Sequence, residues 1–155
     1  MGSGEKDTRF PITPAVTLVE DSHARIRRDL EALEEAQDVD EIGAIVGRLP
    51  ELLKEHFEEE ERPGGLFDEL GSLRPTIDSQ LKFLIQEHRE ILQTLEGLQE
   101  RIREADEATQ AGELEQRHDH IRMSAACFMQ LIRHHERIET RLVSDTYYTE
   151  DGGSG

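Results

Sequence analysis

Two pairs of residues in this sequence could bind a metal ion, because in each a histidine precedes a glutamate by four positions. The pairs are His56 with Glu60 and His135 with Glu139. Residues four apart lie on the same face of an α-helix, so each pair would present an imidazole and a carboxylate in one direction. Neutral imidazoles and ionised carboxylates together suit first-row metals such as iron, manganese or zinc.

The segments that must position these pairs are helical. Four stretches carry apolar residues at alternating steps of three and four, which is typical of one buried face on each helix. They run from about 14 to 36, 40 to 61, 75 to 108 and 112 to 144. Thr13 can cap the first helix, which begins at Pro14, and Pro50 should kink or split the second. An apolar stretch at 66–70 predicts a short extra turn between the second and third helices.

Each of the four apolar stripes includes a histidine, and two include a glutamate one turn later. The six residues are His23 in the first helix, His56 and Glu60 in the second, His88 in the third, and His135 and Glu139 in the fourth. Four such helices bury their stripes against each other as an all-α bundle. Burying imidazoles and carboxylates in a small core is unfavourable unless something compensates, and a metal does so for the whole set. Six ligands are too many for one ion but suit two ions bridged by Glu60 and Glu139.

Composition sets limits on the partners and the compartment. The 155 residues are enough for one domain, with 35% apolar and 34% charged residues and a net charge of −17. This charge argues against nucleic acid or an anionic membrane as partner. Cys127, the one cysteine, cannot form an intrachain disulfide and lies in the apolar run AACFMQLI, where we expect it in the core. No run is long enough for a membrane span, so we expect a soluble cytoplasmic protein. We expect residues 1–12 to be disordered or extended, 13–145 to form the bundle and 146–155 to form a flexible tail.

The order of these residues resembles the hemerythrin family, and within it the HHE cation-binding branch. That branch has a histidine on the first helix, His-x-x-x-Glu on the second, a histidine on the third and His-x-x-x-Glu on the fourth. The resemblance covers residues 14 to 145 and implies an up-down-up-down four-helix bundle holding a non-haem di-iron centre. It implies two iron ions with an oxo or hydroxo bridge, in preference to manganese or zinc. By analogy His23 and His56 would bind one iron, His88 and His135 the other, and Glu60 and Glu139 would bridge them.

The sequence departs from the oxygen-carrying members of this family at one position. Those proteins place a further histidine four residues after the one on the third helix, where this chain has Leu92. One iron would then have fewer nitrogen ligands and an additional exchangeable position. His134 and Glu59 are less favoured ligands because they lie beside the stripes, and we expect Glu58 and Glu61 to be solvated. Tyr147 and Tyr148 are expected to pack rather than to bind metal.

The resemblance implies three kinds of function. The first is binding of dioxygen, peroxide or nitric oxide as a sensor, store or scavenger. The second is a di-iron enzyme with catalase- or peroxidase-like activity, and the third is an interaction module that responds to iron. The fold alone does not choose among them, and the sequence leaves the physiological ligand, the electron donor and the oligomeric state open.

Overall fold

The computed structural model describes residues 14–108 and 110–149, and these form a helical bundle. The long helices are α1 (Pro14–Glu35), α2 (Val39–Glu61), α4 (Asp78–Asp106) and α5 (Ala111–Ser144). A short helix α3 (Leu66–Leu73) and a 3-10 turn η1 (Pro75–Ile77) connect α2 to α4, and a π-helical turn η2 (Asp145–Thr149) follows α5. The predicted all-α four-helix architecture is therefore confirmed, including the short extra turn before the third long helix.

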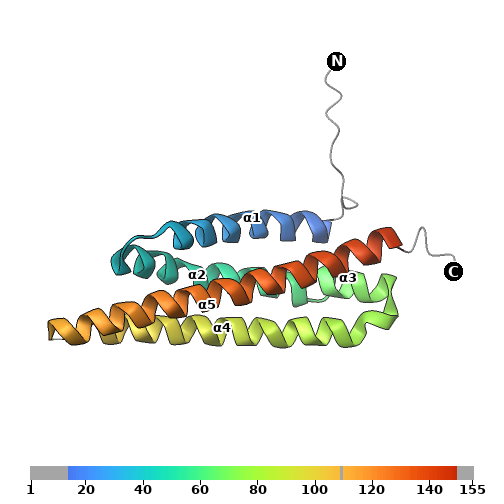
Figure 1. Ribbon diagram of the computed structural model, residues 1–155. Helices are drawn as coiled ribbons and strands as arrows, with labels where there is room; N and C mark the ends of the chain where they lie inside the picture. Colours follow the sequence, from blue (N-terminus) through green and yellow to red (C-terminus); the bar gives the residue numbers. More distant parts are fainter. Residues whose placement is uncertain (1–13, 109, 150–155) are drawn as a thin grey trace, which may run out of the picture.

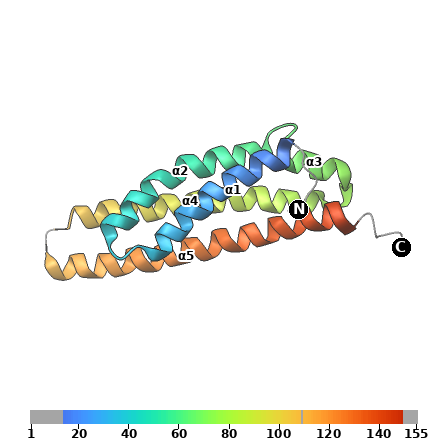
Figure 2. The same ribbon diagram turned by 90° about the horizontal axis from the view of Figure 1, so that it is seen from above.

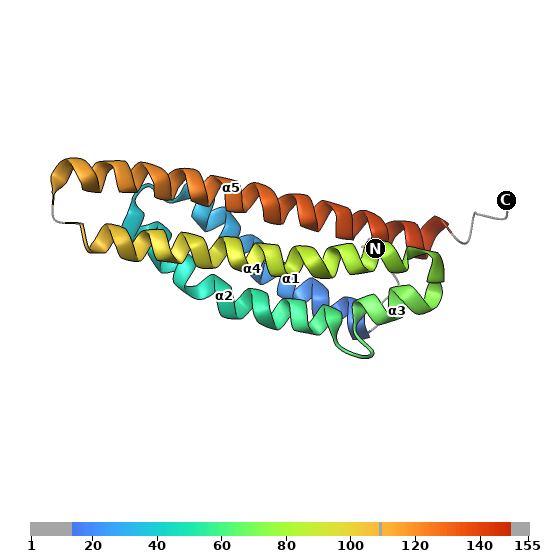
Figure 3. The same ribbon diagram turned by 90° about the horizontal axis from the view of Figure 1, so that it is seen from below.

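Successive long helices run in opposite directions, up-down-up-down (Figure 1). Helix α1 packs beside α2 and α5, and α4 packs beside the same two helices, so the four enclose one core (Figure 2). Helices α4 and α5 have 29 and 34 residues, whereas α1 and α2 have 22 and 23. As a result the α4–α5 hairpin extends beyond the α1–α2 turn (Figure 3). At the opposite end, α3 packs beside α1, α2 and α4 (Figure 3).

Local sequence accounts for the course of α2. Asp38 caps the helix, because its side chain accepts a hydrogen bond from the Glu41 backbone N–H at 2.8 Å. Of the two outcomes predicted for Pro50, a kink or a split, the split does not occur, since α2 continues through it. Proline has no N–H to offer the Val46 carbonyl one turn earlier. The Gln99 side chain of α4 donates a long hydrogen bond of 3.5 Å to that oxygen instead.

The ends of the chain lie partly outside the described residues. The predictions for residues 1–12, for the cap at Thr13 and for 150–155 cannot be compared with the structure, because these residues are outside the described part. The predicted start of the tail at 146 differs from the structure, in which helical structure continues through η2. Thr146 is buried and donates its hydroxyl hydrogen bond to the Leu142 carbonyl at 2.8 Å. Tyr147 packs against the core, as predicted, whereas Tyr148 is exposed.

The core consists of two apolar clusters along the bundle. The larger lies toward the α1–α2 turn and includes Leu30, Leu49, Leu53, Leu95 and Phe128. The smaller lies under α3 and includes Val19, Leu66, Leu70, Leu84 and Leu142. The helix periodicity that predicted the stripes is thus expressed as burial on one face of each long helix. None of the described helices is both long and apolar enough to cross a membrane.

The prediction that Cys127 is a core residue is wrong, because its side chain is exposed. Its neighbours Ala125 and Phe128 are buried, with 3% and 0% exposure. One residue corresponds to a rotation of about 100° around an α-helix, so the position before Phe128 lies off the buried face. The run AACFMQLI therefore contains residues from both faces of α5.

Candidate metal centre

Four imidazoles and two carboxylates meet between the two apolar clusters. Their potential ligand atoms form two overlapping groups, and within each group all of the atoms lie within 4.8 Å of one another. The first group is His23, His56, Glu60 and Glu139, and the second is Glu60, His88, His135 and Glu139. The structure therefore brings together all six residues singled out from the sequence, and the two glutamates belong to both groups.

The helices place these residues at one level of the bundle. His23 is nine residues after the start of α1 and His88 ten after the start of α4, while His135 is nine before the end of α5. At 1.5 Å per residue this level is about 14 Å from the end covered by α3. His56 is only five residues before the end of α2, and α3 fills the space left beyond it (Figure 2).

Each carboxylate lies between histidines of the two groups. Glu60 Oε1 is 3.1 Å from His56 Nε2 and 3.2 Å from His88 Nε2. Glu139 Oε1 is 3.3 Å from His23 Nε2, and its Oε2 is 3.3 Å from His135 Nε2. A carboxylate with one histidine of each pair beside it is in the position of a bridge between two cations.

These polar atoms are buried without hydrogen-bond partners. Among the described residues, both carboxylate oxygens of Glu60 and of Glu139 lack a partner of suitable geometry, as do the Nε2 atoms of His88 and His135 and Nδ1 of His56. An unsatisfied buried polar atom is costly, and such atoms are rare in folded proteins. Lone pairs that converge with no hydrogen-bond donor between them suit a cation. The nitrogen and oxygen ligand atoms therefore fit the implied metals.

The four histidines divide by their pKa values. Burial and the neighbouring His23 lower the pKa of His56 to about 3, and burial and the neighbouring His135 lower that of His88 to about 3. Burial acts in the same direction on His23 and His135, but contacts with Glu139 outweigh it and raise the pKa of both above 6.5. Each group thus contains one imidazole that is neutral at neutral pH and one that holds its proton more strongly.

The two carboxylates influence each other. Burial, together with the charge of Glu139, raises the pKa of Glu60 well above its usual value. Burial opposes ionisation of Glu139 too, but contacts with Glu60, His135 and His23 lower its pKa. Two carboxylates in one dry site favour a single negative charge, and a cation removes that restriction.

Carboxylates also support the outer ring nitrogens of the second group. His88 Nδ1 donates to Glu61 Oε2 at 2.7 Å, and His135 Nδ1 donates to Glu87 Oε1 at 2.9 Å. These bonds leave each Nε2 free to face the site, since the proton is held on Nδ1. Glu61 is therefore more than a solvated residue, which corrects the sequence prediction, although its side chain is 34% exposed. Glu87 was not identified from the sequence.

The alternative ligands lie outside the two groups. His134 is exposed, and Glu59 is buried but accepts a hydrogen bond from the Ser22 hydroxyl. Leu92 packs against the larger apolar cluster and contributes no donor atom. The ring of His88 lies between Phe57, stacked at a centroid distance of 3.8 Å, and Phe67 at 5.5 Å.

A small pocket reaches the first group from the surface. Its volume is about 40 Å³, and His23 and Glu139 form part of its wall. The remaining lining is mostly apolar and comprises Val16, Val19, Glu20, Leu66, Thr140 and Val143. A small molecule could therefore approach the side of the site that His23 occupies.

Comparison with known proteins agrees with this geometry. The family model described as the hemerythrin HHE cation binding domain matches residues 15–145, which include all six converging residues. No curated protein and no solved structure matches the chain.

Proposed function

The chain belongs to the hemerythrin HHE cation-binding family, and we propose that it is a non-haem di-iron protein that binds dioxygen or a related small ligand. The observation that carries this proposal is the pair of ligand groups that share Glu60 and Glu139. A single-metal site would need neither two separate histidine pairs nor two shared carboxylates. Peroxide and nitric oxide are the related ligands, and the roles of sensor, store and scavenger are all compatible with the site.

In this proposal His23 and His56 hold one iron and His88 and His135 hold the other. A pair of ferrous ions supplies the two electrons that dioxygen takes up when it binds. The chain provides neutral imidazoles, bridging carboxylates and two apolar clusters that exclude bulk water on either side. Glu61 and Glu87 fix the ring orientation of His88 and His135 by accepting from their Nδ1 atoms.

The size of the entry pocket supports a small ligand. A cavity volume of about 40 Å³ compares with the roughly 10–15 Å³ that a cavity needs to hold one water molecule. The pocket therefore has room for a molecule of a few heavy atoms. The valine and leucine side chains of the wall also favour a neutral ligand over a charged one that carries a hydration shell.

Peroxide disproportionation is the second candidate, and Leu92 is the observation that favours it. The second group has only two histidines, because Leu92 offers no nitrogen at the position of the further histidine. The iron at His88 and His135 would then have an additional exchangeable position. Peroxide could bind there without displacing a protein ligand.

The experiment is anaerobic loading of the protein with ferrous iron, followed by visible spectroscopy before and after air is admitted. Absorption bands that appear with oxygen and disappear when it is removed support reversible binding. Rapid oxygen evolution after addition of peroxide supports the enzyme instead. The matched variants are His56→Ala, which should abolish the bands, and His134→Ala, which should retain them. Retention of the bands in His56→Ala would contradict the proposed ligand set.

A further inference from the structure

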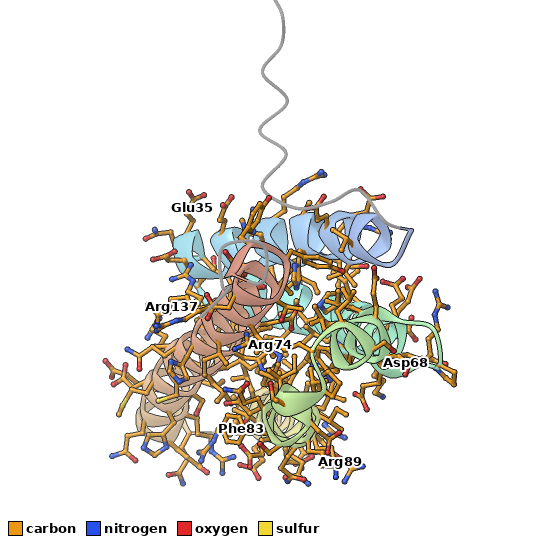
Figure 4. The ribbon with its side chains drawn as sticks, turned by 90° about the vertical axis from the view of Figure 1, so that its right-hand side faces the viewer. Glu35, Asp68, Arg74, Phe83, Arg89 and Arg137 are labelled. Atoms are coloured by element: carbon orange, nitrogen blue, oxygen red, sulfur yellow. The ribbon has the colours of Figure 1, made fainter. Side chains whose placement is uncertain are left out.

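A groove with a volume of about 580 Å³ runs between α1 and α5, outside the candidate metal centre. Four arginines dominate its lining, which comprises Arg27, Arg133, Glu136, Arg137, Thr140, Arg141, Ser144 and Asp145. Figure 4 shows Arg137 on the flank of the bundle opposite Asp68 of α3. The concentration of positive charge is unexpected in a chain whose net charge is −17.

Three of these arginines form one row on α5. Arg133, Arg137 and Arg141 are four residues apart, so their like charges are neighbours on the helix surface, an arrangement that disfavours the helix. Three other arginines of the bundle each pair with a carboxylate three or four residues away on the same helix. The pairs are Arg103 with Glu100, Arg117 with Glu113 and Arg122 with Asp119. Within the row, Arg141 lies near Asp145 four residues later, whereas the carboxylate partner of Arg133 is on α1.

The guanidinium groups of the groove are only partly neutralised. Arg133 pairs with Glu34 of α1 at 2.6 Å, and Arg141 lies 4.0 Å from Asp145. Among the described residues, no carboxylate oxygen lies within 4.0 Å of the Arg27 or Arg137 nitrogens. The acidic residues in the lining are Glu136 and Asp145, so the groove has more positive than negative charge.

The chemistry of the lining suits oxyanions. Guanidinium groups bind phosphate and carboxylate oxygens with two parallel hydrogen bonds, and Thr140 and Ser144 add hydroxyl groups. The acidic remainder of the protein repels an anion only weakly at physiological salt, where the screening length is about 8 Å. The charges nearest to the groove therefore determine whether an anion is attracted, and most of these belong to arginines.

We propose that the groove is a binding site for a small anion with two or more phosphate or carboxylate groups. This groove lies beside the metal centre, because Thr140 lines both the groove and the small pocket at His23 and Glu139. The proposal rests on the arginines and the cavity alone. It stands or falls independently of whether the histidines hold iron.

The test is calorimetric titration of the metal-loaded protein with fructose 1,6-bisphosphate, inorganic phosphate and tricarballylate at physiological salt, where the acidic remainder of the chain is screened. We expect saturable binding of one bisphosphate or tricarboxylate per chain, and weaker binding of inorganic phosphate. The double variant Arg27→Gln/Arg137→Gln should bind about tenfold more weakly or worse, since it removes both unpaired guanidiniums. The control Arg103→Gln/Arg122→Gln makes the same change in net charge elsewhere and should bind like the original chain.

Comparison of the two multivalent probes separates phosphate from carboxylate as the preferred group. Binding at the iron ions is distinguished because the groove variant would leave it unchanged. Absence of saturable binding for all three anions would overturn the proposal, as would an equal loss of affinity in the control. Circular dichroism verifies that each variant is folded. If the double variant fails to fold, the single variant Arg137→Lys tests the same point, because it keeps the charge and loses the paired hydrogen bonds.

Discussion

Replacement of Glu87 by glutamine should loosen one metal ion and leave the other in place. Glu87 accepts the Nδ1 proton of His135 at 2.9 Å, and Glu61 accepts that of His88 at 2.7 Å. Both supported histidines belong to the second group. Nδ1 of His56, in the first group, has no such partner among the described residues. We therefore expect the metal at His88 and His135 to be held more tightly in the original chain.

The expected magnitude follows from burial. Loss of a carboxylate that supports a metal-binding histidine weakens metal affinity by about 10- to 100-fold, or about 1.4 to 2.7 kcal/mol. The Glu87 side chain is 7% exposed, so Glu87→Gln should lie near the upper end of this range. The Glu61 side chain is 34% exposed. Water can replace part of its contact, and Glu61→Gln should cost about tenfold.

The assay is competition with a graded series of chelators, in which the metal remaining per chain is measured at each step. The original chain should lose its ions in two separate steps, and Glu87→Gln should bring the later step close to the earlier one. Glu58→Gln, at an exposed position of the same helix as Glu61, is the control and should change neither step. If Glu87→Gln shifted both steps by the same amount, the assignment of Glu87 to one metal would be refuted.

Three further predictions concern protons, a glycine turn and the core. In the metal-free protein at about pH 6, His23 and His135 should be protonated because their pKa values lie above 6.5, whereas His56 and His88 have pKa values of about 3 and should be neutral. Metal binding should then release at least the two imidazole protons, and metal affinity should rise with pH. Calorimetry in buffers of different ionisation enthalpy measures the number of protons released. Release of less than one proton per chain would contradict the prediction. Gly65→Ala should destabilise the fold by about 1–3 kcal/mol, since a Cβ there would lie 3.0 Å or less from three backbone carbonyl oxygens. Gly97→Ala, where a Cβ would meet no other atom, should stabilise the fold by about 0.5–1 kcal/mol. Urea unfolding compares the two variants, and equal effects would count against the turn geometry. Leu95→Ala, at a side chain with 1% exposure, should lower the free energy of unfolding by about 2–5 kcal/mol, and a loss below 1 kcal/mol would show that the cluster relaxes around the gap.

The sequence was sufficient to predict the bundle and the convergence of the six polar residues. The reason is that helix periodicity fixes which face each residue occupies, and a histidine in an apolar stripe must enter the shared core. His23 and His88 have no glutamate one turn later, yet their phase alone brought them to the site. The structure adds the distances, which place Glu60 and Glu139 each within 3.3 Å of one histidine from either group.

Other features depend on contacts between helices and left no signal in local sequence. Glu61 and Glu87 each reach a histidine on another helix, so their partners are set by packing. The exposure of Cys127 was missed for a simpler reason: the apolar run around it was interpreted as one face, although the phase of Phe128 already excluded it. The arginine groove requires α1 beside α5, which periodicity does not specify.

The most direct test of the central claim is the metal content of the protein after anaerobic loading with ferrous iron, combined with Mössbauer spectroscopy of the oxidised sample. The account predicts two irons per chain with coupled spins, because in the proposed site Glu60 and Glu139 would bridge them. The double variant Glu60→Gln/Glu139→Gln would remove two ligands from each iron and should lower the iron content per chain. One iron per chain, or two without magnetic coupling, would contradict a carboxylate-bridged pair.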